Sequence, residues 1–255
     1  MATSWSLAPL VEQRAQEHPT RVLATNGERT WTYQQVDTDA SSLAAAFSEL
    51  GLGTGDRIAV NLPNGVEWII ATLAAAKLGA VVVPVSPQLS MHELRYQLRH
   101  AEASAVVTIE KWDGVDFLQR FEELLGDLPD LQYVVTVGDE DLWYDDRIFQ
   151  FEDLVSSGAG RPVPRPAVYD ETADLAVMYT SGTMGKPKGV PLSHRALVEN
   201  AVRVAELLEI SPDDRVLGAV PFFAIFGFGV MLGTMARGAT IVLQPSFDPA
   251  RALAL

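Results

Sequence analysis

The chain has 255 residues, of which 48% are hydrophobic and none is cysteine. This content suffices for a sizeable core, and the lack of cysteine excludes disulfides, thiolate catalysis and thiolate metal sites. With 33 acidic against 19 basic residues, the net charge of −14 argues against nucleic acid as a main partner, because phosphate backbones need a basic surface.

Short apolar runs and a polar N-terminus favour a soluble cytoplasmic protein. The longest apolar stretches, Trp68–Ala76 and Ala80–Val85, are too short to span a bilayer, and no signal peptide precedes them. Only four basic residues are lysines and fifteen are arginines. An acidic, lysine-poor surface suits a salt-rich cytoplasm, where screening weakens self-repulsion. A GC-rich genome explains the same composition equally well.

The first half of the chain alternates β-rich runs with helical periodicity. A hairpin is predicted around Asn26 and Gly27, from Arg21–Thr25 and Arg29–Thr32. The elements predicted after it are a helix over Tyr33–Leu50, a strand over Arg57–Leu62, a helix over Gly65–Leu78, a strand over Ala80–Val85, a helix from Ser90 to His100, a strand over Ala105–Ile109, a helix over Phe117–Leu125 and a strand over Tyr133–Val137. This order predicts an α/β fold with a mostly parallel sheet and helices on both of its faces.

The second half starts with an irregular segment. Glycines and prolines over 138–168 indicate a surface excursion or a connection between subdomains. The elements predicted after it are a strand over Asp174–Tyr179, a helix from His194 to Glu209 capped by Ser193, a strand over Arg215–Val220, a helix over Phe223–Arg237 and a strand over Thr240–Leu243. Asp248 and Pro249 then begin a helix that has few residues left, so we expect a longer protein.

The stretch from Tyr179 to Val190 indicates a phosphate-binding loop. Glycines there let the backbone approach a ligand closely, and successive amides form a concavity for anions. Hydroxyls and two of the four lysines add donors and positive charge. The candidate ligands are Thr180, Ser181, Gly182, Thr183, Met184, Gly185, Lys186, Lys188 and Gly189.

This loop is not of the Walker type. Only two residues separate Gly182 from Gly185, and Pro187 follows Lys186 and resists the helical turn that a Walker lysine needs. The alternative interpretation is an exposed glycine-rich loop whose lysines are solvated.

The order from Tyr179 to Val190 resembles the signature loop of the adenylate-forming superfamily, which includes acyl- and aryl-CoA synthetases, luciferases and amino-acid adenylation domains. The resemblance continues through Trp31–Tyr33, Lys77–Val85 and Val190–Arg195, with Met184 where threonine is usual. It implies that residues 1–255 are the incomplete N-terminal part of a large AMP-binding domain with αβαβα layers. A small C-terminal domain would be absent.

The resemblance also implies a reaction. The loop would hold the β- and γ-phosphates of ATP, Thr180 would assist Mg²⁺, and a carboxylate would attack the α-phosphorus to give an acyl adenylate. Coenzyme A would then take the acyl group. Because the catalytic residues of the family are expected beyond residue 255, we expect this chain to be inactive alone.

The segment Pro221–Gly229 is the candidate acyl pocket. Its candidate residues are Phe222, Phe223, Ala224, Phe226 and Gly227, although aromatic residues at such a helix start also commonly fill a core. Ala224 stands where the family places a histidine, and no aspartate lies between Pro221 and Gly233 to pair with a substrate ammonium. We therefore expect a fatty or aryl acid.

Three alternatives stay open. The protein could be another adenylate-forming member that activates amino or aryl acids. It could be a stand-alone phosphate-binding or interaction module, or a half that assembles with a separately encoded chain. The sequence leaves the oligomeric state open, a homodimer included.

Overall fold

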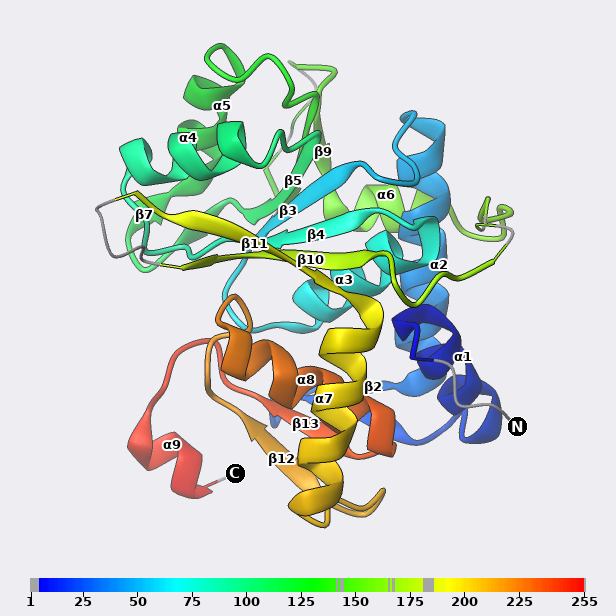
Figure 1. Ribbon diagram of the computed structural model, residues 1–255. Helices are drawn as coiled ribbons and strands as arrows, with labels where there is room; N and C mark the ends of the chain where they lie inside the picture. The colour runs from blue at the N-terminus through cyan, green and yellow to red at the C-terminus, as the bar shows by residue number, and fades with distance from the viewer. Residues whose placement is uncertain are drawn as a thin grey trace.

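The computed structural model describes residues 5–140, 142, 145–164, 166, 168–180 and 186–254, which form two β-sheets and the helices around them (Figure 1). The helices are α1 (Leu7–Glu17), α2 (Tyr33–Glu49), α3 (Val66–Leu78), α4 (Met91–His100), α5 (Phe117–Leu125), α6 (Phe151–Ser157), α7 (His194–Leu207), α8 (Ile225–Arg237) and α9 (Pro249–Ala254). The strands are β1 (Val22–Thr25), β2 (Thr30–Thr32), β3 (Arg57–Asn61), β4 (Val81–Pro84), β5 (Ala105–Ile109), β6 (Lys111–Trp112), β7 (Val115–Asp116), β8 (Tyr133–Val137), β9 (Ile148–Gln150), β10 (Asp174–Thr180), β11 (Lys188–Ser193), β12 (Arg215–Gly218) and β13 (Thr240–Leu243).

The larger sheet has seven strands in the order β11-β10-β4-β3-β5-β8-β9, and all neighbours are parallel except β10 and β11. Side chains alternate across it. Ile58 and Val60 belong to one core cluster with residues of α2 and α3, whereas Ala59 belongs to a second cluster with residues of α4 and α5. Helices therefore cover both faces, as the sequence predicts and as Figure 1 shows.

The chain reverses its direction of winding beside β3. It passes from β3 to β4 on one side and then to β5 on the other, which places α3 and α4 on opposite faces of the sheet. At such a reversal, the loops after the carboxyl ends of the strands diverge and leave a crevice, where ligands commonly bind in open α/β sheets. Thr180 ends β10 and Pro84 ends its parallel neighbour β4, so both residues lie at these carboxyl ends.

The smaller sheet has four strands in the order β12-β13-β1-β2 and includes the predicted hairpin, with Gly27 at φ 92°. Helix α8 contacts α7, β12 and β13. The two sheets share one core, because Val60 and Val82 belong to the same buried cluster as Ile241 and Leu243. Strands far apart in the sequence are thus joined into one folded body.

A buried lysine ties the first three helices together. Lys77 on α3 is 1% exposed, and its Nζ lies 2.6 Å from Glu12 Oε1 on α1 and 2.8 Å from Asp37 Oδ1 on α2. A buried charge requires such partners, because an unpaired ammonium in a protein interior is costly.

Several predicted elements agree closely with the structure. β5, α5 and β8 have the predicted bounds, and the capping box of Ser90 and Glu93 is present at the start of α4. The predicted start of α9 is also present, since Asp248 Oδ1 accepts the amide of Arg251.

The segment 138–168 differs from the irregular connection that the sequence suggests. It contains β9, which pairs with β8, and α6, whose Phe151 and Leu154 are buried. The strands before and after it, β8 and β10, belong to the same sheet. Helix α1 and strands β6, β7 and β11 were also not predicted. None of the helices in the described chain has the length and hydrophobicity needed to cross a membrane.

Candidate functional site

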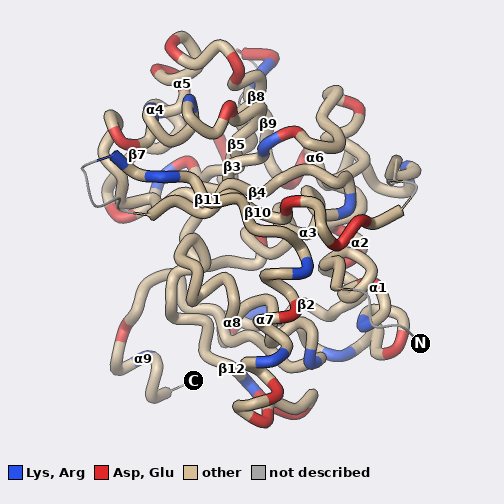
Figure 2. The backbone as a smooth tube through the Cα atoms, in the orientation of Figure 1, with Lys and Arg blue, Asp and Glu red and all other residues tan. Residues whose placement is uncertain are grey.

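The phosphate-loop motif is carried by the antiparallel pair β10 and β11. Thr180 ends β10, Lys188 begins β11, and the two residues are register partners. Thr180, Lys186 and Lys188 are exposed, and Figure 2 shows a basic segment where β11 begins. The predicted ligands Ser181, Gly182, Thr183, Met184 and Gly185 lie outside the described residues. The sequence places a helix directly after the loop, whereas β11 comes first and α7 follows it.

Gly189 makes room for a tyrosine. A Cβ built on Gly189 would lie 2.9 Å from Val177 Cγ1 and 3.2 Å from Tyr179 Cζ. Contacts this short force the neighbours to move. In the described structure, the missing side chain of Gly189 therefore serves the packing of Tyr179, its cross-strand partner.

Helix α4 holds both ends of the loop. The hydroxyl of Tyr179, next to Thr180, donates to Gln97 O at 3.2 Å and lies 2.8 Å from His100 Nδ1. On the other side, Tyr96 Oη donates to Pro187 O at 3.1 Å. Burial raises the pKa of Tyr179 to about 12, so its hydroxyl keeps its proton at neutral pH. Both loop ends are thus fixed to one helix.

A cavity of about 470 Å³ joins the two predicted motifs. Thr180 and Lys186 line it from the loop, and Phe223 and Ala224 line it from the aromatic segment. The other lining residues come from the end of β4, the segment after it, α4 and the loop ends: Pro84, Ser86, Leu89, His92, Glu93, Tyr96, Gln97, Tyr179 and Pro187. Phosphate-binding and acyl-binding candidates therefore face one space.

Helix α4 also lines this cavity, which the sequence did not predict. His92, Tyr96 and His100 are spaced by four, so they share one face of the helix that Ser90 caps. The rings of Tyr96 and His100 lie 5.6 Å apart, and those of His100 and Tyr179 lie 5.7 Å apart. The i, i+4 spacing of these polar rings was the available signal.

The five candidate acyl residues occupy three different environments. Phe223 and Ala224 face the shared cavity. Phe222 is fully buried, with its ring 5.7 Å from that of Trp68. Gly227 is buried where a Cβ would meet Pro221 O at 2.1 Å, so it serves close packing. Phe226 is 65% exposed and lines a second, apolar cavity of about 340 Å³ between α7 and α8.

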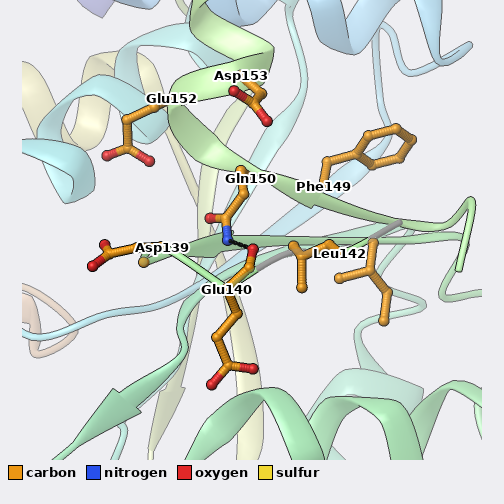
Figure 3. A pocket seen from close by; sticks show the side chains of 9 residues that line it. Asp139, Glu140, Leu142, Phe149, Gln150, Glu152 and Asp153 are labelled. Carbon is orange, nitrogen blue, oxygen red and sulfur yellow. Dashed lines mark hydrogen bonds between the residues drawn. The ribbon is translucent and has the colours of Figure 1, made fainter. Parts of the chain in front are cut away.

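A third cavity, drawn in Figure 3, lies at the opposite edge of the large sheet from β11 and has an acidic lining. Asp139, Glu140, Glu152 and Asp153 line it, and Gln150 Nε2 donates to Glu140 O at 2.7 Å. This lining repels phosphate groups. Across the described residues, no group of three His, Asp or Glu side chains is arranged to hold a metal ion.

His194, which follows the loop motif, has a structural position. It is 5% exposed, and its Nδ1 accepts the amide of Leu7 at 3.2 Å. Burial lowers the pKa of His194 to about 4, so the side chain is neutral at pH 7 and adds no positive charge near the loop.

The AMP-binding enzyme family matches residues 11–255. The chain belongs to this family.

Two curated relatives of the AMP-binding chain come from Bacillus subtilis. A long-chain-fatty-acid–CoA ligase is 30% identical over 271 residues, covering 97% of this chain and 48% of the relative. A 2,3-dihydroxybenzoate-AMP ligase is 30% identical over 244 residues, covering 94% of this chain and 43% of the relative. The chain thus spans about half the length of the curated relatives it matches.

Solved structures share the fold. The apo structure of MbtA from Mycobacterium smegmatis has a TM-score of 0.84 and 28% identity to this AMP-binding chain, covering 97% of this chain and 45% of that one. The described fold is therefore that of the N-terminal portion of adenylate-forming enzymes, as the sequence resemblance implies.

Proposed function

We propose that this chain forms the phosphate- and acid-binding part of an ATP-dependent acid–thiol ligase. The carboxylate oxygen of the acid would attack the α-phosphorus of ATP, which forms an acyl adenylate and releases pyrophosphate. The thiol of coenzyme A would then attack the acyl carbon and release AMP. Relatives that are named as CoA ligases and AMP ligases support this reaction class.

One observation carries the proposal: Thr180 and Lys186 line the same cavity as Phe223 and Ala224. An adenylating enzyme must bring the phosphates of ATP and the carboxylate of the acid together, and holding both in one site lowers the entropic part of the barrier. The exposed ammonium of Lys188 and the hydroxyl of Thr180 are available for the charge on the phosphates.

The described residues also fit a magnesium ion held largely by the nucleotide. Mg²⁺ prefers oxygen ligands and commonly takes one or two from the protein and the rest from phosphates and water. The hydroxyl of Thr180, at the end of β10, would supply one protein ligand. The ion would neutralise charge on the phosphates as pyrophosphate leaves.

The cavity favours an acid without a charged group near its carboxylate. Ala224 gives its part of the wall no polar side chain, and Phe223 adds an aromatic surface. An amino acid would need a carboxylate partner for its ammonium. No acidic residue lies between Pro221 and Gly233. Glu93, the carboxylate in the described lining, is already bonded to Ser90 at the start of α4. We propose a fatty or aryl acid as substrate.

The test is ATP–pyrophosphate exchange with a panel of fatty, aryl and amino acids, in the protein that carries residues 1–255. We expect exchange with fatty or aryl acids and coenzyme A-dependent release of AMP. If pyrophosphate exchange occurs but coenzyme A does not cause release of AMP, the protein is another adenylate-forming member. Tight binding of MgATP without exchange for any acid would show a binding module instead and would contradict the proposal.

For residues 1–255 expressed alone, we propose that acid-dependent exchange is absent or very weak. The described residues include no lysine or arginine other than Lys186 in the lining of the shared cavity. Exchange by residues 1–255 at the rate of the intact protein would contradict this part of the proposal.

A further inference from the structure

Asn64 links the two sheets next to the shared cavity. It follows β3 in the large sheet and is 4% exposed. Its Nδ2 donates to Gly218 O and to Val220 O, both at 2.9 Å, and its Oδ1 accepts the amide of Phe222 at 2.8 Å. Gly218 ends β12 in the small sheet, so one side-chain amide joins the exits of two strands from different sheets.

These three bonds fix the start of the aromatic segment. They engage both donors of the Asn64 amide and its acceptor, and the Asn64 side chain is buried. Moving the segment would leave buried polar groups without partners, which is costly. Phe222 is held a second time, because its ring packs edge-on against Trp68 of α3. The residues directly after it, Phe223 and Ala224, line the cavity.

We propose that Asn64 is a positioning residue for acid recognition. It sets the distance between the wall that Phe223 and Ala224 form and the loop end that carries Thr180. This inference rests on the proposed function, in which that wall faces the acid. The three hydrogen bonds of Asn64 reach neither Thr180 nor Lys186. Loss of these bonds should therefore change KM for the acid and leave KM for ATP nearly unchanged.

Asn61 provides a matched control three residues earlier. It is also a buried asparagine, 1% exposed, at the end of the same strand. Its Nδ2 donates to Val85 O, directly after β4, and its Oδ1 accepts from Thr108 Oγ1 of β5, both at 3.3 Å, so neither bond reaches the segment 218–222. Loss of Asn61 removes a buried amide of the same kind without releasing the segment 218–222.

The experiment uses the intact protein that carries residues 1–255. It measures KM for the acid and KM for ATP, by pyrophosphate exchange, in wild type, Asn64→Ala, Asn64→Asp and Asn61→Ala. We expect both Asn64 variants to raise KM for the acid by about tenfold or more and to change KM for ATP by less than about twofold, because each removes buried hydrogen bonds to one wall only. Asn61→Ala should leave the ratio of the two KM values near that of wild type. Equal changes in both KM values, or an acid effect of Asn61→Ala as large as that of Asn64→Ala, would overturn the inference.

Hydrogen exchange tests the clamp without catalysis. In wild type the amide of Phe222 should be protected, and in Asn64→Ala its exchange should be at least about tenfold faster. Asn64→Asp keeps an acceptor for this amide and is the matched comparison, in which exchange of the Phe222 amide should be slower than in Asn64→Ala. Fast exchange of the Phe222 amide in wild type would overturn the clamp even if no variant folds. Absence of pyrophosphate exchange in wild type with every acid would instead contradict the proposed function, while this measurement still decides the position of Asn64.

Discussion

At the residue scale, the packing of Gly189 under Tyr179 can be tested by adding one methyl group. In Gly189→Ala the new Cβ would lie 2.9 Å from Val177 Cγ1 and would press on the ring of Tyr179. We expect a loss of about 1–3 kcal/mol in the free energy of unfolding, as for other overpacked sites, measured by urea denaturation. Gly53→Ala is the control, because a Cβ there meets nothing within 4 Å. Equal stability of the two variants would contradict the packing role.

The burial of His194 predicts that the free energy of unfolding depends on pH. Its folded-state pKa of about 4 lies below the usual histidine pKa of about 6.5 because the ring is buried. The unfolded chain therefore binds this proton more readily, and the stability that His194 contributes is complete above pH about 6.5 and is lost as pH falls through about 4. Between pH about 4 and about 6.5, protonation of His194 changes the free energy of unfolding by at most about 1.4 kcal/mol per pH unit.

The control for this prediction is His194→Asn, which offers a different acceptor to the amide of Leu7 and does not titrate in this range. Urea denaturation at a series of pH values should give a flatter dependence for the variant than for wild type. Identical pH dependence in the two proteins would show that His194 is not protected from protonation.

At the element scale, α4 holds both ends of the predicted phosphate loop, through Tyr96 and Gln97. Tyr96→Phe removes only the hydroxyl that donates to Pro187 O. Loss of one such bond should raise KM for MgATP by roughly 2- to 10-fold in pyrophosphate exchange, with KM for the acid nearly unchanged. Tyr133→Phe is the control, because this ring packs against Phe149 on β9, at the other edge of the sheet. No change in Tyr96→Phe would contradict the support.

The elements that sequence reasoning predicted are those with strong local signals. The capping box at Ser90 and the continuous apolar runs of β4 and β5 mark elements whose conformation the neighbouring residues themselves favour. β11 gave no such signal, because it contains Gly189 and Pro191 and has no fully buried side chain. Such a strand is defined by its pairing with β10, which is a tertiary contact.

The candidate site was predictable in part for the same reason. The loop and the aromatic segment have distinctive compositions, so the sequence predicts both, and residues from both line one cavity. The contributions of Asn64 and Tyr96 depend on contacts between residues that are 91 or more positions apart in the chain. No local pattern encodes those distances.

At the scale of the whole molecule, the net charge of −14 predicts a dependence on salt. Figure 2 shows acidic segments over both halves of the chain, so screening relieves repulsion throughout the molecule. The two sheets share one core, and we therefore expect a single unfolding transition whose midpoint rises from low salt to about 1 M salt. A midpoint that is independent of salt would contradict adaptation to a salt-rich cytoplasm, and two separate transitions would contradict the shared core.

The central claim is that the phosphate loop and the aromatic segment serve one reaction in one cavity. The most direct measurement is acid-dependent ATP–pyrophosphate exchange in Ala224→Trp, with an aromatic or long-chain acid and with acetate. The indole should occupy space next to Phe223 within the cavity, so the account predicts that kcat/KM for the larger acid falls by about tenfold or more relative to that for acetate. An unchanged ratio between the two acids, in a variant that folds and binds ATP, would contradict the account.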